Sequence, residues 1–199
     1  ARAGRRVLLV DLDPQANLTQ STGQEQSART IYGALRGDYG PEAVPITNGL
    51  DLIPSTLDLS GAELELSQEA GREFILRDVL ESIAGRYELI LIDCPPSLGL
   101  LTLNAFSAAD EILVPLQPEF LAVQGIAKLE DVVARVRKRL NPRLRIGAVL
   151  LTQYDSRKTL HRDTAENVRE HFGDVVLRAM IRPNVALAEA PALRLDVFR

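Results

Sequence analysis

The sequence predicts a doubly wound α/β fold, in which a mostly parallel sheet is flanked by helices. Six short runs are rich in Val, Leu and Ile, and most of them are continuous rather than alternating, which is typical of strands that are buried on both faces. Segments with apolar residues at helical spacing lie between these runs. Strands that alternate with helices connect by right-handed crossovers, so the pattern favours one parallel sheet covered on both sides.

The expected strands cover residues 7–12, 50–54, 89–92, 112–116, 146–152 and 175–181. Helices are expected over residues 74–83, 126–140 and 160–172, with a partly helical segment within 55–70. Gly85, Asn141-Pro142 and Gly173 supply the three stop signals. In the third helix the apolar stripe is read as Leu160, Ala165, Val168 and Phe172. The region 20–49 is the least regular and is expected to be a loop with one short helix.

The composition is that of an ordinary soluble globular protein, with 46% apolar and 25% charged residues in a chain of 199. This length suits one domain with a full core. The single cysteine, Cys94, excludes an internal disulfide and is read as a small buried filler rather than a reactive thiol. The sequence has no run long enough to cross a bilayer and no secretory signal pattern, so a cytoplasmic location is expected.

Charge is unevenly distributed along the chain, whose net charge is −4. Residues 1–100 carry 8 basic and 15 acidic residues, whereas residues 101–199 carry 15 and 12. Nine basic residues and one acidic residue, Asp155, lie within 135–162. This window is either an anion-attracting surface or a solvated helix end, where cations complement the helix dipole.

Two predicted strands end in carboxylates. Asp11 and Asp13 lie two residues apart and project to one side if the first strand continues that far. Such carboxylates are costly unless they meet a cation or hold a water, although Asp-Pro is also common turn chemistry. Four apolar residues precede Asp93, which is the Walker B pattern of a residue that holds Mg²⁺ through a water.

Four segments, in order and at the matching spacing, resemble those of ParA/Soj partition ATPases of the deviant Walker A class. They read VLLVDLDPQANLT, LILIDCPPSLGLLTLNA, ILVPLQPEFLAVQGI and VALAEAP, and the resemblance spans essentially the whole chain. It implies a fold like that of the P-loop NTPases. It also implies ATP hydrolysis by in-line attack of water, with Mg²⁺ as the metal.

The resemblance also assigns roles to the carboxylates. Asp13 corresponds to the residue that positions the attacking water, and Asp11 lies close to the metal and the phosphates. Asp93 is the Walker B residue that holds the metal beside the nucleotide.

On the base side of the nucleotide, the resemblance points to Gln153, Pro183 and Asn184. Arg182 and Pro183 are inverted relative to the family's Pro-Arg-Asn, so contact through the backbone around Pro183 is favoured over a side-chain role for Arg182. An ordinary junction between a strand and a loop is the alternative.

The family's glycine-lysine loop, of the form KGGVGKTT, is expected about one helix upstream of residue 5. Residues 1–4 are read as the end of that helix. Residues 1–199 are therefore expected to be a single, incomplete ATPase domain that is truncated at both ends. Alone, it is expected to bind nucleotide poorly, because the amides and lysines that hold the phosphates are missing.

The implied partners are a second copy of the protein on ATP binding, non-specific DNA, and a centromere-binding protein of the ParB/Spo0J kind. No membrane partner is expected, and the implied location is the nucleoid. Arg157 aligns with an arginine that the family uses for DNA, with Lys158 and Arg162 as additional candidates, while a second family arginine falls at Ala186. Residues 119–125 correspond to a region near the dimer face, where Leu121 and Val123 are expected in the core.

Three alternatives share this fold. A MinD-like membrane-cycling ATPase needs a C-terminal amphipathic helix and usually differs at DCPPS. A metabolic enzyme such as an ATP-dependent carboxylase or amidase needs further acid-base residues, and His161 and His171 are both expected on a solvent-facing helix. An iron-sulfur carrier needs more cysteines than Cys94. Outside this superfamily, the alternative is a non-enzymatic α/β binding module.

Overall fold

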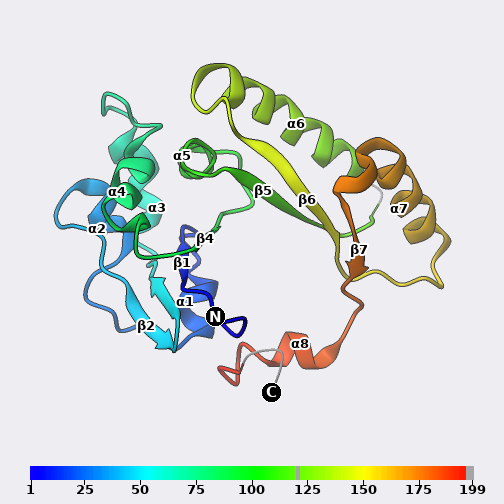
Figure 1. Cartoon of the computed structure of the whole chain (residues 1–199), viewed down its shortest axis with the longest axis horizontal. Helices are drawn as coiled ribbons and strands as arrows, with labels where there is room; N and C mark the ends of the chain where they lie inside the picture. The colour runs from blue at the N-terminus through cyan, green and yellow to red at the C-terminus, as the bar shows by residue number, and fades with distance from the viewer. Residues whose placement is uncertain (120–121, 196–199) are drawn as a thin grey trace. The chain divides into compact units, whose positions relative to one another are not determined.

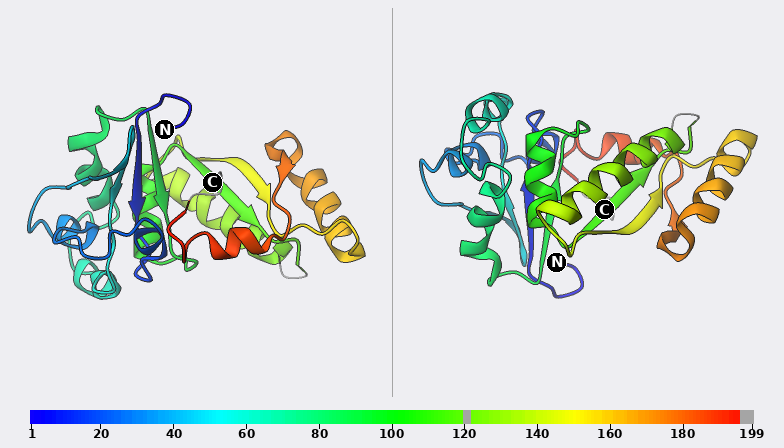
Figure 2. Two further views of the ribbon diagram at one scale, coloured as in Figure 1. Left: turned by 90° about the horizontal axis from the view of Figure 1, so that it is seen from below. Right: turned by 90° about the horizontal axis from the view of Figure 1, so that it is seen from above.

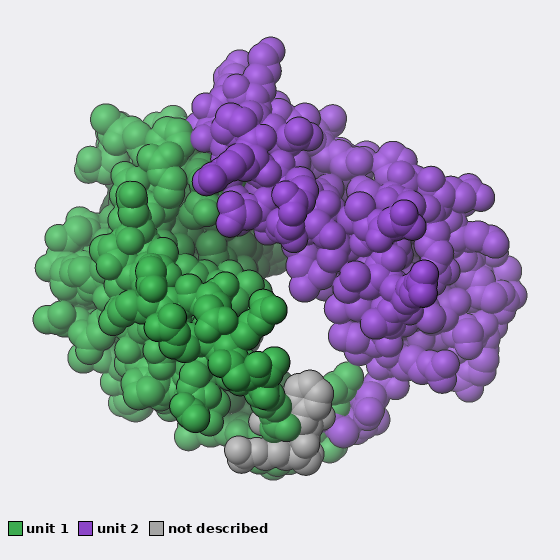
Figure 3. Space-filling model, in the orientation of Figure 1, with its two compact units in different colours: residues 1–108, 187–199 green, residues 109–186 purple. Residues whose placement is uncertain are grey.

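The computed structural model describes residues 1–119 and 122–195, without the side chains of residues 122 and 123. The expectations for Leu121 and Val123 therefore lie outside the described part of the chain. The chain divides into two compact units (Figure 3). Unit 1 comprises residues 1–108 with those from 187 onward, and unit 2 comprises residues 109–186.

The sheet of unit 1 is mostly parallel. Strands β1 (Val7–Asp11), β3 (Leu50–Ile53) and β4 (Leu89–Asp93) run parallel, and β2 (Val44–Thr47) pairs antiparallel with β3. The strand order is β2-β3-β1-β4 (Figure 1), and Figure 2 shows β1 between its two parallel neighbours. β1 is therefore central, with a parallel partner strand along each of its edges.

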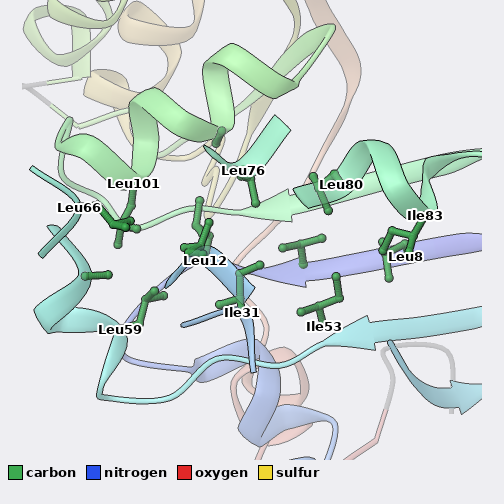
Figure 4. Close-up of a cluster of buried hydrophobic side chains, with 14 residues drawn as sticks. Leu8, Leu12, Ile31, Ile53, Leu59, Leu66, Leu76, Leu80, Ile83 and Leu101 are labelled. Atoms are coloured by element: carbon green, nitrogen blue, oxygen red, sulfur yellow. The ribbon is translucent and has the colours of Figure 1, made fainter. Parts of the chain in front are cut away.

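The core of unit 1 forms where helices cover one face of this sheet. These helices are α2 (Ile31–Arg36), α3 (Leu59–Leu66), α4 (Ile75–Ala84) and α5 (Leu100–Ala108), while α1 (Asn17–Ser21) follows β1 directly. From the β1 segment, Leu8, Val10 and Leu12 enter the core together with Leu76 and Leu101 (Figure 4). Because strand side chains alternate, Leu9 and Asp11 project from the other face.

Unit 2 has a parallel sheet of order β5-β6-β7, formed by β5 (Glu111–Leu116), β6 (Arg145–Leu151) and β7 (Val176–Met180). Helix α6 (Ala122–Arg139) connects β5 to β6. Helix α7 (Thr159–Phe172) and the 3₁₀ turn η1 (Gly173–Val175) connect β6 to β7. The core contains Ile126 of α6 and Val168 of α7 against Val149 and Leu151 of β6. The short helix α8 (Val185–Glu189) follows β7.

All six expected strands are present, and none of their ends differs from the expected position by more than one residue. The prediction for residues 20–49 was wrong in one respect, since this region contains β2 as well as the short helix α2. Asn48-Gly49 makes the tight turn of the β2–β3 hairpin, with Gly49 at φ 74°, a left-handed conformation that suits glycine. A Cβ at this position would lie 3.2 Å from the Arg5 carbonyl oxygen.

Residues 1–4 form a turn closed by the Gly4 N–H and the Ala1 carbonyl at 2.8 Å, and their assignment to the end of an upstream helix stays a prediction. One local expectation needs correction. In α7 the inward face contains His161 (3% exposed) instead of Leu160 (43% exposed). His161 is in phase with Ala165 and Val168 at helical spacing, whereas the expectation that His171 faces solvent was right.

None of the helices in the described residues is both long enough and apolar enough to cross a membrane.

Candidate functional site

The carboxyl ends of β1 and β4 meet at the same edge of the unit 1 sheet. Asp11 and Asp93 are paired in the parallel register, and the Leu12 N–H donates to the Asp93 carbonyl at 2.8 Å. Adjacent strands lie about 4.8 Å apart, and paired residues project to the same face. Since Ile90 and Ile92 of β4 pack against the core, Asp93 projects from the opposite face, as Asp11 does.

Asp11 is completely buried, and hydrogen bonds satisfy both of its carboxylate oxygens. Its Oδ2 accepts the Thr19 N–H at 2.8 Å and the Thr19 hydroxyl at 2.6 Å, while Oδ1 accepts the Asp13 N–H at 3.2 Å. Burial raises the pKa of Asp11, and the Thr19 hydrogen bonds oppose this rise because they favour the ionised form. Asp11 thus fastens the start of α1 to the end of β1.

Thr19 connects this pair to a third element. Its hydroxyl oxygen accepts the Ser55 N–H at 2.9 Å, directly after β3, and the Ser55 hydroxyl donates to the Asp13 carbonyl at 2.8 Å. Asp11, Thr19 and Ser55 are all at most 2% exposed. The ends of β1 and β3 and the start of α1 are therefore held by one buried polar network, which we call the Asp11–Thr19–Ser55 junction.

Asp13 lies in a tight loop next to this junction. Its Oδ1 accepts the Gln15 N–H at 2.9 Å, and its carbonyl accepts the Ala16 N–H at 2.9 Å. Ala16 has φ 53° and ψ 34°, a left-handed conformation that a non-glycine residue adopts only when its surroundings impose it. The half-buried Asp13 carboxylate is thus held at a defined position.

Asp93 differs from Asp11 because its side chain makes no hydrogen bond to another described residue and part of it reaches solvent. Burial of the remainder raises its pKa, and the negative charges of Asp11 and Asp13 raise it further. Three carboxylates therefore gather at one sheet edge without a compensating cation among their described neighbours. Such a site favours a bound cation.

The carboxylates fit a metal-nucleotide complex better than a bare metal ion. Within residues 1–119 and 122–195, no group of three or more His, Cys, Asp or Glu side chains is arranged to hold a metal by itself. Mg²⁺ is commonly held by one or two carboxylates together with phosphate oxygens and waters. Asp93 and Asp13 can reach such a complex, whereas the burial and inward hydrogen bonds of Asp11 favour a positioning role.

The residues expected on the base side lie in unit 2, where the segments after β6 and β7 are joined. The Ile181 N–H donates to the Leu151 carbonyl at 2.9 Å, and the Tyr154 N–H donates to the Ile181 carbonyl at 3.0 Å. Gln153, between them, is exposed with φ 50°.

Pro183 and Asn184 follow directly and are exposed. The Asn184 side-chain oxygen accepts the Ala186 N–H at 2.9 Å at the start of α8. The structure therefore brings these two predicted segments together, while their contact with a base remains a prediction.

The three basic residues expected to contact DNA surround the N-terminus of α7. Arg157 donates from Nε and Nη2 to the two carboxylate oxygens of Asp155, at 2.9 and 2.8 Å, although its side chain is 89% exposed. These bonds hold the pKa of Asp155 well below its usual range. Arg162 donates to the Ser156 carbonyl and the Thr159 hydroxyl, and the charge of Lys158 contributes to the lowered pKa of Asp155.

The buried side chain of His161 forms a hydrogen bond with the backbone of this loop. Its Nδ1 accepts the Asp155 N–H at 3.1 Å, which places the ring proton on Nε2 in the neutral form. Nε2 lies 3.5 Å from Glu119 Oε1 and is the one fully buried side-chain nitrogen or oxygen in the described chain without a hydrogen-bond partner. His161 thus fixes the backbone of the residue that pairs with Arg157.

Sequence reasoning missed Thr19, Ser55 and His161. Thr19 lies inside the VLLVDLDPQANLT segment, and Ser55 follows the carboxyl end of a predicted strand, where ligand-binding residues are sought in such sheets. His161 precedes Ala165 and Val168 by four and seven residues, so its position on the inward face is readable from helical spacing.

We expect Thr19→Val to destabilise the protein by about 2 kcal/mol or more, because it removes a donor from buried Asp11 and an acceptor from the Ser55 N–H. Urea unfolding followed by circular dichroism measures this change. Thr19→Ser retains the hydroxyl and serves as the control. A Thr19→Val midpoint equal to that of Thr19→Ser would contradict the structural role of the junction.

Cys94 is expected to be unreactive in the folded protein. Burial raises the pKa of its thiol to about 12, with further contributions from the charges of Asp93 and Asp13, so little thiolate exists at pH 8. Labelling with a chromogenic disulfide at pH 8 should be roughly a hundredfold slower in the native protein than in guanidinium chloride. Because Cys94 is the single cysteine, the signal is unambiguous, and equal rates would refute the prediction.

Comparison with known proteins places this arrangement in a family. Residues 1–146 match the family described as AAA domain. The chromosome partitioning protein ParA of Caulobacter vibrioides (strain NA1000 / CB15N) is 48% identical over 199 residues, which cover 96% of this chain and 74% of that protein. The chromosome-partitioning ATPase Soj of Treponema pallidum (strain Nichols) is 42% identical over 201 residues, covering 99% and 79%.

The fold is shared with a solved structure of cobyrinic acid a,c-diamide synthase from Mycobacterium smegmatis, determined with bound ATP analog and magnesium. The two chains are 40% identical with a TM-score of 0.85, and the match covers 97% of this chain and 80% of the other. The identities to ParA and Soj over nearly the whole chain show that the protein belongs to the ParA/Soj family of chromosome-partitioning ATPases.

Proposed function

We propose that this protein hydrolyses Mg²⁺-ATP to drive DNA partition, with the catalytic carboxylates at the unit 1 sheet edge. The observation that carries the proposal is the pairing of Asp11 with Asp93, with Asp13 held in the adjoining loop. Three carboxylates with no cation beside them suit the charge of a magnesium ion bound to phosphates. The ATP-analogue and magnesium complex of a 40% identical structure supports this choice of ligand.

Each carboxylate has a distinct role in the proposed reaction. Bound Mg²⁺-ATP supplies the reacting phosphoryl group and the metal charge. Asp93, which extends partly into solvent, holds the metal side of the site. Asp13 accepts a hydrogen bond from the attacking water and orients it. Asp11 acts through Thr19 and the Asp13 N–H to keep that carboxylate in place, so catalysis depends on positioning and charge.

We propose further that both units belong to one ATPase domain, whose phosphate-binding loop is not among these residues. The AAA domain match continues across the boundary between residues 108 and 109. No glycine-lysine loop occurs within the 199 residues.

The surface around Arg157 is proposed to contact DNA phosphates without sequence preference when the protein dimerises on ATP. The first turn of α7 contains no acidic residue, so its positive dipole end adds to Lys158 and Arg162. Cationic contacts to phosphate suffice for non-specific binding. Gln153, Pro183 and Asn184 remain the proposed base-side residues. The proposed stimulating partner is a ParB/Spo0J-like centromere-binding protein, and the proposed location is the nucleoid.

A second candidate function is that of a metabolic enzyme in the same superfamily, favoured by the name of the M. smegmatis structure. ATP turnover distinguishes the two proposals, because a partition ATPase responds to DNA and a centromere-binding protein. Turnover that requires cobyrinic acid and ignores DNA would favour the enzyme named in that structure.

We expect Asp13→Ala in the full-length protein to lower ATP turnover roughly a hundredfold or more while leaving nucleotide affinity within a few-fold. Steady-state phosphate release and fluorescent-nucleotide titration measure the two quantities. Gln15→Ala, which removes an exposed side chain from the same loop, is the control. Turnover that persists in Asp13→Ala would rule out its role in orienting water.

Arg157→Glu in the full-length protein is expected to abolish DNA retention at moderate salt and to spare ATP-dependent dimerisation. Asp155→Asn is expected to tighten DNA binding roughly threefold or more and to steepen its salt dependence by about one charge, because Asp155 competes with phosphate for Arg157. Fluorescence anisotropy across a salt series measures both. Asp174→Asn removes one exposed carboxylate at the other end of α7 and should change neither quantity.

A further inference from the structure

The basic window within residues 135–162 is divided between the two ends of β6. Arg157, Lys158 and Arg162 follow the carboxyl end of the strand, whereas the other basic residues precede the strand or, in the case of Arg145, begin it (Figure 1). A seven-residue strand is about 20 Å long, so the two groups form separate surfaces of unit 2. The group at the amino end, which we call the α6-end patch, contains Arg135, Arg137, Lys138, Arg139 and Arg143.

The α6-end patch is a concentrated and largely unpaired positive charge. Residues 134–145 contain six basic residues and no acidic residue. Arg145, outside the patch, pairs with Glu111. In the described chain, the side chains of Arg137, Lys138, Arg139 and Arg143 form neither an ion pair nor a hydrogen bond, and all four residues are exposed.

Complementing the helix dipole does not account for this amount of charge. The C-terminus of α6 has the equivalent of about half a negative charge, which one or two cations in the last turn already balance. The last turn alone contains Arg137, Lys138 and Arg139. The patch therefore retains a net positive charge on a protein whose overall charge is −4.

The backbone beneath the patch is well held. Buried Asn141 donates from Nδ2 to the Ala109 carbonyl at 2.6 Å and accepts the Arg143 N–H through Oδ1 at 3.2 Å. The turn after α6 is thus fixed to the start of β5, and Arg143 is fixed with it. Between helix and turn lies an open hollow lined by Arg137, Lys138, Ala134 and Pro142. Asn141 therefore anchors the turn that carries Arg143 beside the last turn of α6.

The chemistry of the patch favours a polyanion over a protein partner. No large hydrophobic side chain is exposed between residues 134 and 145 in this fully described segment, whereas protein interfaces depend on buried apolar and aromatic anchors. Flexible cations without apolar anchors suit the phosphates of a nucleic acid backbone. We propose that the α6-end patch is a second DNA-backbone contact surface, separate from that of Arg157; this inference rests on the proposed DNA-binding function.

The test compares Arg137→Gln/Lys138→Gln in the full-length protein with the matched control Lys128→Gln/Arg178→Gln, which removes two exposed cations outside the patch. Binding to a duplex of arbitrary sequence is followed by anisotropy with ATP across a NaCl series. Loss of two phosphate contacts should reduce the slope of log affinity against log salt by about 1.8 and weaken binding roughly tenfold at physiological salt. The control should match the wild type.

The inference is overturned if Arg137→Gln/Lys138→Gln binds DNA as the control does. Unchanged DNA binding with lost binding of polyglutamate would assign the patch to an acidic protein instead and would equally overturn it. Arg157→Gln is measured in parallel at low salt, where independent surfaces should give additive losses. If DNA binding is weakened in Arg137→Gln/Lys138→Gln but not in Arg157→Gln, the α6-end patch is supported and the assignment of Arg157 is rejected. The two proposals can therefore fail separately.

Discussion

The buried carboxylate of Asp11 is the constraint on which the candidate site depends. A charge with no exposure to water is tolerated only when hydrogen bonds replace its hydration, and Thr19 and the Asp13 N–H supply them. To supply these hydrogen bonds to Asp11, the chain after β1 makes a tight loop in which Ala16 adopts the left-handed conformation. Through Ser55 the same network reaches β3. The geometry at Asp13 is therefore a consequence of satisfying Asp11.

Charge is divided between the two units in a way that suits a nucleotide and a nucleic acid. Unit 1 gathers Asp11, Asp13 and Asp93 and raises the pKa of Asp11 and Asp93, a condition that a magnesium ion would relieve. Unit 2 presents cations at both ends of β6, and one of them, Arg157, is already engaged by Asp155. Within the described residues, the carboxylates of unit 1 and the cations at the end of α6 have few counter-charges, which indicates ligands of complementary charge.

His161 illustrates how a buried polar group supports a surface residue. Its Nδ1 accepts the Asp155 N–H, and the His161 side chain is itself buried in the inward face of α7. This backbone hydrogen bond positions the Asp155 carboxylate for Arg157, so groups on the exposed surface are not needed to position it. Exposed ion pairs are usually weak, so the anchored backbone is what makes this pair geometrically defined.

The sequence by itself determined six of the seven strands in their order, the family, and the location of Asp11 and Asp93 at strand ends, because continuous apolar runs and strand-end carboxylates are local patterns. The tertiary structure alone decided the Asp11–Thr19–Ser55 junction, since its members are up to 44 residues apart and only sheet pairing brings them together. Only the structure also showed that the basic residues within 135–162 lie at both ends of β6, because a count of charged residues does not say where those residues lie in space. The β2 hairpin could have been predicted from the turn dipeptide Asn48-Gly49, but its strand has only four residues and contains Pro45, which weakens a strand pattern.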